Sequence, residues 1–175
     1  MKALSLLLFG LVSVLLVSCS NVVYEQPIPE NQQQLTEFPD FIIGTWVDHE
    51  SDTLIIGAKD FRYGDFDGSS IFSGTLSDEI ILKELNNFYF LNIKSDGGYW
   101  ESIAATSDSN YLYLYFVGVD NDLQLNALNN HLKKNTAKSL KKDGKYIINP
   151  EVEELFELLN DSLICKISKL IKITR

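Results

Sequence analysis

Histidine, cysteine and methionine are scarce in this chain of 175 residues, which has two, two and one of them. Because His49 and His131 are the only histidines, a site of three histidines is excluded, and zinc would need carboxylates to complete its shell. The sequence also lacks a Gly-x-Ser-x-Gly elbow, a His-Glu-x-x-His motif and a glycine-rich phosphate loop. Carboxylates are plentiful, but no pair stands out as the acid and base of a glycosidase. We therefore expect a protein that is not an enzyme and that holds no metal and no cofactor.

Basic residues are few over most of the chain. Residues 19–130 hold 18 acidic and only 4 basic side chains, and the whole chain has a net charge of −9. An acidic body argues against nucleic-acid binding and against adsorption on anionic lipid. Residues 131–148 are the exception, and their lysines are Lys133, Lys134, Lys138, Lys141, Lys142 and Lys145. This basic segment is either a docking patch for an acidic partner or a solvated loop, and the sequence leaves both open.

The N-terminus indicates export. Met1-Lys2 is followed by an apolar run over residues 3–17, which is too short for a spanning helix and typical of a secretory signal over residues 1–18. The tetrapeptide at the end of this run, Leu16-Val17-Ser18-Cys19, resembles the lipobox of bacterial lipoproteins. The resemblance implies cleavage after Ser18 and acylation of Cys19, which would anchor the protein in a membrane of the cell envelope. The alternative is an ordinary signal peptide with an incidental cysteine.

Two further inferences follow from an acylated Cys19. Ser20 is not the aspartate that retains such lipoproteins in the inner membrane of enteric bacteria, so the resemblance favours the outer membrane. Cys165 is then left without an intramolecular partner, and among Leu163, Ile164 and Ile167 it is expected to be a buried, inert thiol.

Residues 19–40 are predicted to be a flexible tether. They contain three prolines and the run Gln32-Gln33-Gln34, with few apolar side chains and no helical or alternating period. Such a composition buries too little surface to order itself. A tether of that length has a reach of roughly 25 Å, which would hold a domain clear of the lipid headgroups.

Residues 41–117 are predicted to form an antiparallel meander, because short apolar runs alternate with turn residues such as Asp-Gly and Asn-Asn. The expected strands are 42–48, 53–56, 60–63, 70–74, 79–85, 88–94, 99–104 and 111–117. Eight such strands favour a mainly β fold, an up-and-down barrel or a strongly curled sheet, which removes exposed edges.

The last part of the chain is expected to add a helix and a closing strand. The helix is predicted over 150–160, capped by Asn149, with Pro150 in the first turn and an apolar stripe at helical spacing. Residues 163–173 are rich in isoleucine and alternate as a strand does. A short helix is also expected over residues 122–132, through three leucines at helical spacing.

Gly44-Thr45-Trp46 on the first expected strand resembles the Gly-x-Trp motif of lipocalins and related calycin barrels. The order of elements is similar too, with eight meandering strands, a helix and a last strand. The resemblance implies a lipocalin-like domain over residues 41–175, in which Trp46 plugs the closed end of the barrel. It also implies an Arg or Lys near the chain end over the tryptophan ring, for which Lys172 and Arg175 are the candidates.

Four aromatic residues are candidate ligand contacts. Tyr111, Tyr113 and Tyr115 lie on one face of a strand and would make an amphipathic wall if that face lined a barrel cavity. If instead the opposite face, with two leucines and a phenylalanine, faces the core, the tyrosines point outward. Trp100 follows two glycines, so it is either exposed beside a turn or part of ordinary packing.

These observations favour a membrane-anchored envelope lipoprotein whose non-enzymatic, lipocalin-like domain binds a small amphipathic ligand. The alternative is a structural or assembly protein that contacts other envelope proteins through its surface. A cavity of a few hundred cubic ångströms would favour the first function, and a filled interior with an exposed apolar patch would favour the second.

Overall fold

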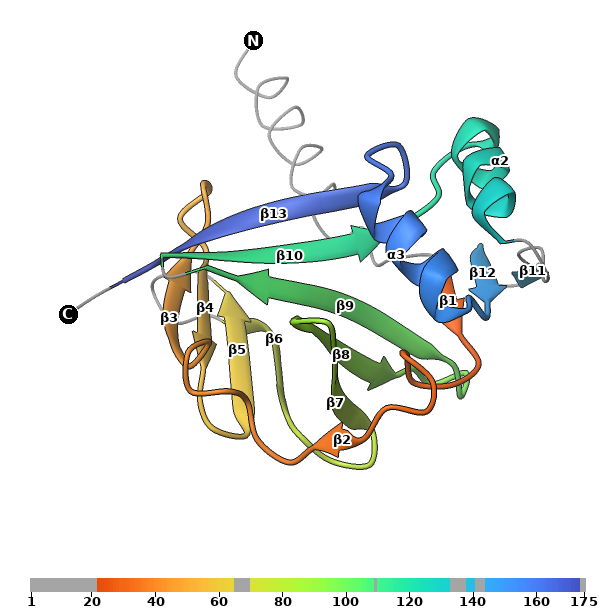
Figure 1. Cartoon of the computed structure of the whole chain (residues 1–175). Helices are drawn as coiled ribbons and strands as arrows, with labels where there is room; N and C mark the ends of the chain where they lie inside the picture. Colours follow the sequence, from red (N-terminus) through yellow and green to blue (C-terminus); the bar gives the residue numbers. More distant parts are fainter. Residues whose placement is uncertain (1–21, 65–69, 109, 133–137, 141–143, 174–175) are drawn as a thin grey trace, which may run out of the picture.

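The structure is a computed structural model that describes residues 22–64, 70–108, 110–132, 138–140 and 144–173. The predicted lipobox with Cys19, and most of the basic segment's lysines, lie outside the described residues. Figure 1 shows one strongly curled sheet, with one helix packed against its outer side and a second helix beside the first.

The predicted meander is confirmed, because all eight strands are present. They are β3 (Gly44–Val47), β4 (Thr53–Ile56), β5 (Asp60–Gly64), β6 (Ser70–Thr75), β7 (Ile80–Leu85), β8 (Phe88–Lys94), β9 (Trp100–Ser107) and β10 (Tyr111–Val117). Each pairs antiparallel with the next, except that β6 and β7 are not neighbours. Asn86 and Asn87 join β7 to β8 with positive φ angles of 52° and 64°, as a tight hairpin needs.

The closing strand is also confirmed, as β13 (Cys165–Lys172). It pairs with β10 along its whole length and with β3 at Ile171 and Lys172, so it joins the last meander strand to the first. The expectation of a barrel of eight strands needs correction. The described residues form one sheet of 13 strands, and it stays open at β6, which pairs only with β5. The result is a curled half-barrel.

The predicted tether is wrong for residues 22–40. β1 (Val22–Tyr24) lies inside the sheet between β9 and β12 (Lys145–Ile148), and Val22 and Val23 are fully buried. β2 (Gln34–Leu35) then pairs with β7. The composition of this segment suggested disorder, but its few apolar side chains are the ones that become buried.

Two polar side chains of the meander hold this N-terminal segment. The buried Asn92 amide accepts from the backbone N–H of Ile28 at 2.9 Å and donates to the Ile28 carbonyl at 2.8 Å. The Lys83 ammonium donates to the carbonyls of Pro27 and Pro29 at 2.8 and 2.9 Å. Burial lowers the pKa of Lys83. Since the segment has no regular structure over these residues, the side-chain bonds satisfy backbone groups that would otherwise be buried alone.

Both predicted helices are present as α2 (Asp122–His131) and α3 (Val152–Asn160). The side chain of Asn121 caps α2 by accepting from the backbone N–H of Gln124. The predicted cap of α3 is wrong, because Glu151 rather than Asn149 is the N-cap. The Glu154 carboxylate accepts from the Glu151 N–H at 2.9 Å, in a reciprocal capping box.

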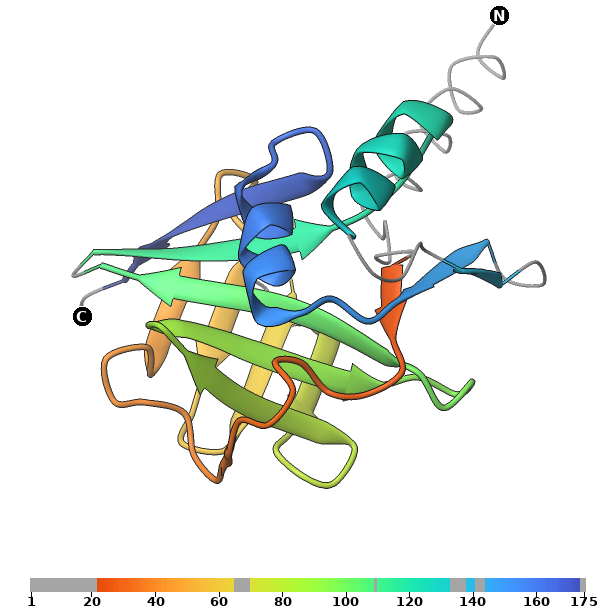
Figure 2. The same ribbon diagram turned by 45° about the vertical axis from the view of Figure 1, so that its right-hand side comes forward.

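The sheet separates two apolar cores. Figure 2 shows β3 to β6 running behind and across β9 and β10, and the first core lies inside this curl. The second lies on the outer side of β8, β9 and β10, where α2, α3, β1 and β12 cover it. β11 (Lys138–Leu140) pairs with β12 at the edge of the sheet. We call these the inner core and the outer core.

Candidate functional site

The inner core contains a cavity of about 450 Å³. Residues from the whole curl line it, including Ile42, Leu54, Ile56, Phe61, Leu82, Leu91, Ile103, Ala105, Leu112, Leu114, Phe116 and Leu170. Aliphatic and phenyl groups thus form most of the wall. The size falls within the usual range of small-molecule pockets, which is roughly 300–1,000 Å³.

The wall arises from strand alternation. On β9, Ala104 belongs to the outer core and the next residue, Ala105, lines the cavity. On β10, Leu112 and Leu114 line the cavity, and Tyr115 packs against the outer core. Successive side chains on a strand point to opposite faces, so both faces of these central strands are apolar.

Exposed residues among the lining residues mark the mouth of the cavity. The side chains of His49, Lys166 and Glu50 line it and are 82 %, 65 % and 42 % exposed. His49 and Glu50 belong to the connection between β3 and β4, and Lys166 is near the start of β13. The mouth therefore lies where β3 ends and β13 begins, and its rim is polar while the interior is apolar.

A hydrogen-bonded group of side chains shapes the rim. The Tyr63 hydroxyl donates to Asp48 Oδ2 at 2.8 Å and contacts Asp52 Oδ2 at 3.1 Å. Asp48 Oδ1 also accepts from the backbone N–H groups of Glu50 and Asp52, which fixes the β3–β4 connection. Burial, followed by the two carboxylates, raises the pKa of Tyr63 far above its ordinary value. Tyr63 is thus a neutral hydrogen-bond donor at every physiological pH.

Trp46 lies in the inner core below this rim and is fully buried. Its indole N–H donates to the Ile42 carbonyl at 2.9 Å. The Lys172 ammonium lies 4.9 Å from the centre of the Trp46 ring and donates to the Phe41 carbonyl at 3.1 Å. Lys172 thus makes the cation–π contact that the Gly-x-Trp resemblance implied, and the other candidate, Arg175, lies outside the described residues.

Gly44 makes room for that contact. Its φ angle is +142°, and a Cβ atom there would lie 3.1 Å from Cε of Lys172. A side chain at this position would strain the backbone and push the lysine stem away from the indole. Gly44, Trp46 and Lys172 therefore act together, although Lys172 is far from the other two in the sequence.

The three tyrosines do not line the cavity, so the prediction that they form its wall is wrong. The alternative is what the structure shows, since Leu112, Leu114 and Phe116 face the cavity instead. Tyr111 and Tyr113 lie on the outside of β10, with the Lys169 ammonium 3.6 and 5.8 Å from their ring centres. Tyr115 packs edge-on against Phe88 at 5.4 Å. The pattern Tyr-Leu-Tyr-Leu-Tyr-Phe contained the right signal, because the purely apolar face is the one that faces inward.

Trp100 is not a surface contact either. It is only 8 % exposed and belongs to the outer core, where Tyr24 of β1 pairs with it. The Lys94 ammonium lies 6.0 Å from its ring. Of the predicted site residues within the described part of the chain, Gly44 and Trp46 are thus the two that lie beside the inner core.

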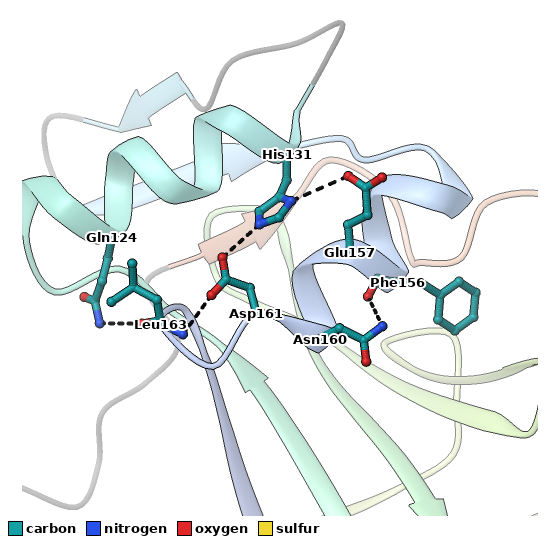
Figure 3. A network of polar contacts seen from close by, with 7 residues as sticks. All are labelled: Gln124, His131, Phe156, Glu157, Asn160, Asp161 and Leu163. Carbon is teal, nitrogen blue, oxygen red and sulfur yellow. Dashed lines mark hydrogen bonds and ion pairs between the residues drawn. The ribbon is translucent and has the colours of Figure 1, made fainter.

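A separate polar network joins the two helices (Figure 3). His131 Nε2 lies 2.8 Å from Asp161 Oδ2, and its Nδ1 lies 3.5 Å from Glu157. Asp161 also accepts from the backbone N–H of Leu163, and the Gln124 amide donates to the Leu163 carbonyl. The hydrogen bonds from His131 and Leu163 lower the pKa of Asp161. This network ties α2 to the end of α3.

Cys165 begins β13 and is 4 % exposed, as the sequence predicted for an inert thiol. Burial raises its pKa to about 11, so the thiolate is scarce at neutral pH. Within the described ranges, no three His, Cys, Asp or Glu side chains come together as metal ligands. The same residues include no helix that is long and apolar enough to cross a membrane.

Comparison of the chain with protein-family models, with curated proteins and with solved structures gives no match. The geometry of the cavity is therefore the basis for a functional proposal.

Proposed function

We propose that this protein is a lipid-anchored lipoprotein of the bacterial cell envelope, and that its non-enzymatic, lipocalin-like domain binds a small amphipathic ligand. The observation that carries the proposal is the apolar cavity of about 450 Å³ inside the curl, with a polar rim. An apolar wall with a few polar groups at the opening suits a molecule with a hydrocarbon body and a polar end.

The lipocalin-like assignment is supported by the arrangement around Trp46. A meander curls around an apolar interior, the Gly-x-Trp motif lies on the first strand of this meander, and a lysine near the chain end covers the indole. The interposed β13 and the open edge at β6 depart from a simple barrel of eight strands. The envelope assignment depends on the lipobox-like Leu16-Val17-Ser18-Cys19, and the outer membrane is favoured by Ser20.

Ligand binding is tested with a mature chain that begins at Ser20 and so keeps every described residue. Native mass spectrometry and the fluorescence of the neutral dye N-phenyl-1-naphthylamine report occupancy. Ala105→Phe, whose new ring points into the cavity, should abolish dye binding. Ile167→Phe, on the exposed outer side of β13, is the control and should bind as the wild type does. Failure of the wild-type chain to bind dye or to carry a ligand would overturn the proposal.

The anchor is tested by Cys19→Ala in the full-length chain. Acylation should be lost, and the protein should move from the detergent phase to the aqueous phase on partitioning, because its acyl chains provide the membrane affinity. Unchanged recovery in the detergent phase would contradict an anchor at Cys19.

One observation favours the second function, contact with another envelope protein. The outer side of β13 exposes Ile167 and Ile171, which are 56 % and 53 % exposed and lie opposite Tyr115 and Tyr111 of β10. Exposed apolar side chains next to aromatic rings are typical of protein interfaces. Ile167→Asp with Ile171→Asp would abolish such an interface and leave dye binding unchanged.

A further inference from the structure

The structure places the proposed anchor close to the folded domain. Val22 is the first residue of β1 and is fully buried. Only Ser20 and Asn21 stand between it and Cys19, and a fully extended chain spans roughly 10 Å over that interval. The inference below rests on the proposed function, because it requires acyl chains on Cys19. An anchor this short holds the domain against the bilayer surface.

The direction of β1 shows which side of the domain faces the anchor. In both views β1 runs downward from Val22, so the chain enters the fold from the upper side (Figures 1 and 2). The first turn of α2, the β3–β4 connection and the α3–β13 connection all lie on this upper side. A bilayer that holds Cys19 therefore approaches these three parts.

The mouth of the cavity is on the same side. Its rim includes Asp48, His49 and Glu50 of the β3–β4 connection, and Lys166 beside the α3–β13 connection. Below Asp48, β13 pairs with β3 only at Ile171 and Lys172, so the first half of β13 is separated from the β3–β4 connection. The opening between them points to the side from which the chain enters.

Two exposed leucines lie on this upper side as well. Leu123 is 65 % exposed and Leu163 is 41 % exposed, and the Gln124 amide donates to the Leu163 carbonyl at 2.9 Å, so the two segments are adjacent. Leu132, at the other end of α2, packs in the outer core with Val22. At 1.5 Å per residue, Leu123 extends roughly 14 Å beyond Leu132 along the helix axis. This projection of α2 and the roughly 10 Å reach of the chain from Cys19 to Val22 are of the same order.

We propose that the domain lies directly on the membrane with Leu123 and Leu163 against the headgroups, and that its cavity faces the bilayer and takes a small amphiphile from the lipid phase. The apolar part of the ligand then passes from hydrocarbon to the apolar wall without crossing bulk water. Its polar end remains at the rim, beside Glu50 and Lys166. The occupant of this surface is lipid, because the anchor fixes lipid there.

Photocrosslinking from vesicles tests this arrangement. The full-length acylated protein is reconstituted in phosphatidylcholine vesicles that contain a trace of lysophosphatidylcholine with a diazirine at the chain end. After irradiation, adducts are mapped by mass spectrometry. We expect them at residues 48–50, at Leu123 and Leu163, and on wall residues such as Leu114. Lys59, in the β4–β5 turn on the opposite side (Figure 1), should show background labelling only.

A matched variant changes only the length of the connection. Insertion of about 20 Gly and Ser residues between Ser20 and Asn21 adds a reach of roughly 25 Å. Labelling of Leu123 and Leu163 should fall about fivefold, because a longer linker lowers the local concentration of lipid at this face. An insertion without effect, equal labelling of Lys59 and Leu123, or rim adducts without wall adducts would each overturn the proposal.

The same experiment separates this inference from the proposed function. If Cys19 carried no acyl chain, the protein would fail to float with the vesicles, which would contradict the anchor itself. If the mature chain failed to bind the dye, the proposal that the cavity binds a ligand would be contradicted. Flotation and dye binding together with labelling at Lys59 equal to that at Leu123 would contradict the orientation alone.

Discussion

The inner and outer cores share the strands β8, β9 and β10, but helices cover the outer core and the cavity lies in the inner core. In the outer core, α3 brings Leu155, Leu158 and Leu159 onto the sheet, and rings such as Phe88 and Phe156 meet edge-on at 5.4 Å. In the inner core, the sheet faces itself across the curl, with Phe38 and Ile42 of the β2–β3 connection, and a cavity of about 450 Å³ remains. A helix can tilt and slide until its side chains fill the space, whereas strands fixed by hydrogen bonds cannot approach further. The comparison predicts that the outer core provides stability and the inner core provides space.

The largest effect is expected where the inner core depends on one side chain. Trp46→Ala should lower the free energy of unfolding by roughly 3–5 kcal/mol, because a fully buried indole is lost with its hydrogen bond to Ile42 and its contact with Lys172. Urea unfolding followed by circular dichroism measures it. A loss below about 1 kcal/mol would contradict the role of Trp46 as the plug of the inner core.

A matched pair of leucines compares the cores directly. Leu158→Ala, in the helix-covered outer core, should cost about 3–5 kcal/mol, since it creates a new void. Leu112→Ala should cost about 2 kcal/mol, because Leu112 lines an existing cavity and has fewer contacts to lose. Both side chains are nearly fully buried, at 0 % and 1 % exposure, so burial does not explain a difference. Equal losses of unfolding free energy would mean that the inner core is as tightly packed as the outer.

Two adjacent alanines of β9 give a sharper comparison. Ala104→Phe places a ring in the outer core and should destabilise the protein by about 1–3 kcal/mol through overpacking. Ala105→Phe places the same ring in the cavity and should change the free energy of unfolding by less than about 1 kcal/mol. Thermal unfolding of the two variants measures the difference. If Ala105→Phe were the more destabilising variant, the cavity would be unable to accommodate a phenyl ring.

The sequence predicted the elements of the fold better than their closure. Alternation and turn residues were sufficient for the eight strands and for β13, and leucines at helical spacing were sufficient for α2, because these signals are local. Closure depends on long-range pairings, such as Lys172 with Trp46, and on the missing β6–β7 pairing, which no local pattern encodes. The N-cap of α3 is Glu151 and not the predicted Asn149, because the Glu154 side chain accepts from the Glu151 backbone N–H. The sequence offered both residues within a short interval.

The predicted tether shows the same limit. Its prolines and glutamines indicated disorder, but Val22 completes the outer core, and Asn92 and Lys83 hold the backbone around Ile28 from more than fifty residues away. The tyrosine row of β10 was a choice between two faces, and packing decided it. In both cases the local sequence allowed two states, and contacts with distant residues selected one of them.

The smallest effect is expected at the polar network over the outer core. The pKa of Asp161 is lowered in the folded state by hydrogen bonds from His131 and Leu163, so folding favours the ionised carboxylate. A lowered pKa contributes stability above the unfolded value of about 3.9, and this contribution is lost as the pH falls through the folded pKa. Asp161→Asn should therefore lower the urea midpoint at pH 6 and have a smaller effect near pH 3.

Glu157→Gln provides the control for this network, because Glu157 lies 3.5 Å from the same histidine but does not accept from Leu163. Its substitution should change the urea midpoint less than Asp161→Asn does at pH 6. A difference between wild type and Asp161→Asn that is the same at pH 3 and pH 6 would show that the side chain acts by packing. Such a result would mean that apolar contacts of the outer core, and not the polar network, hold α2 and α3 together.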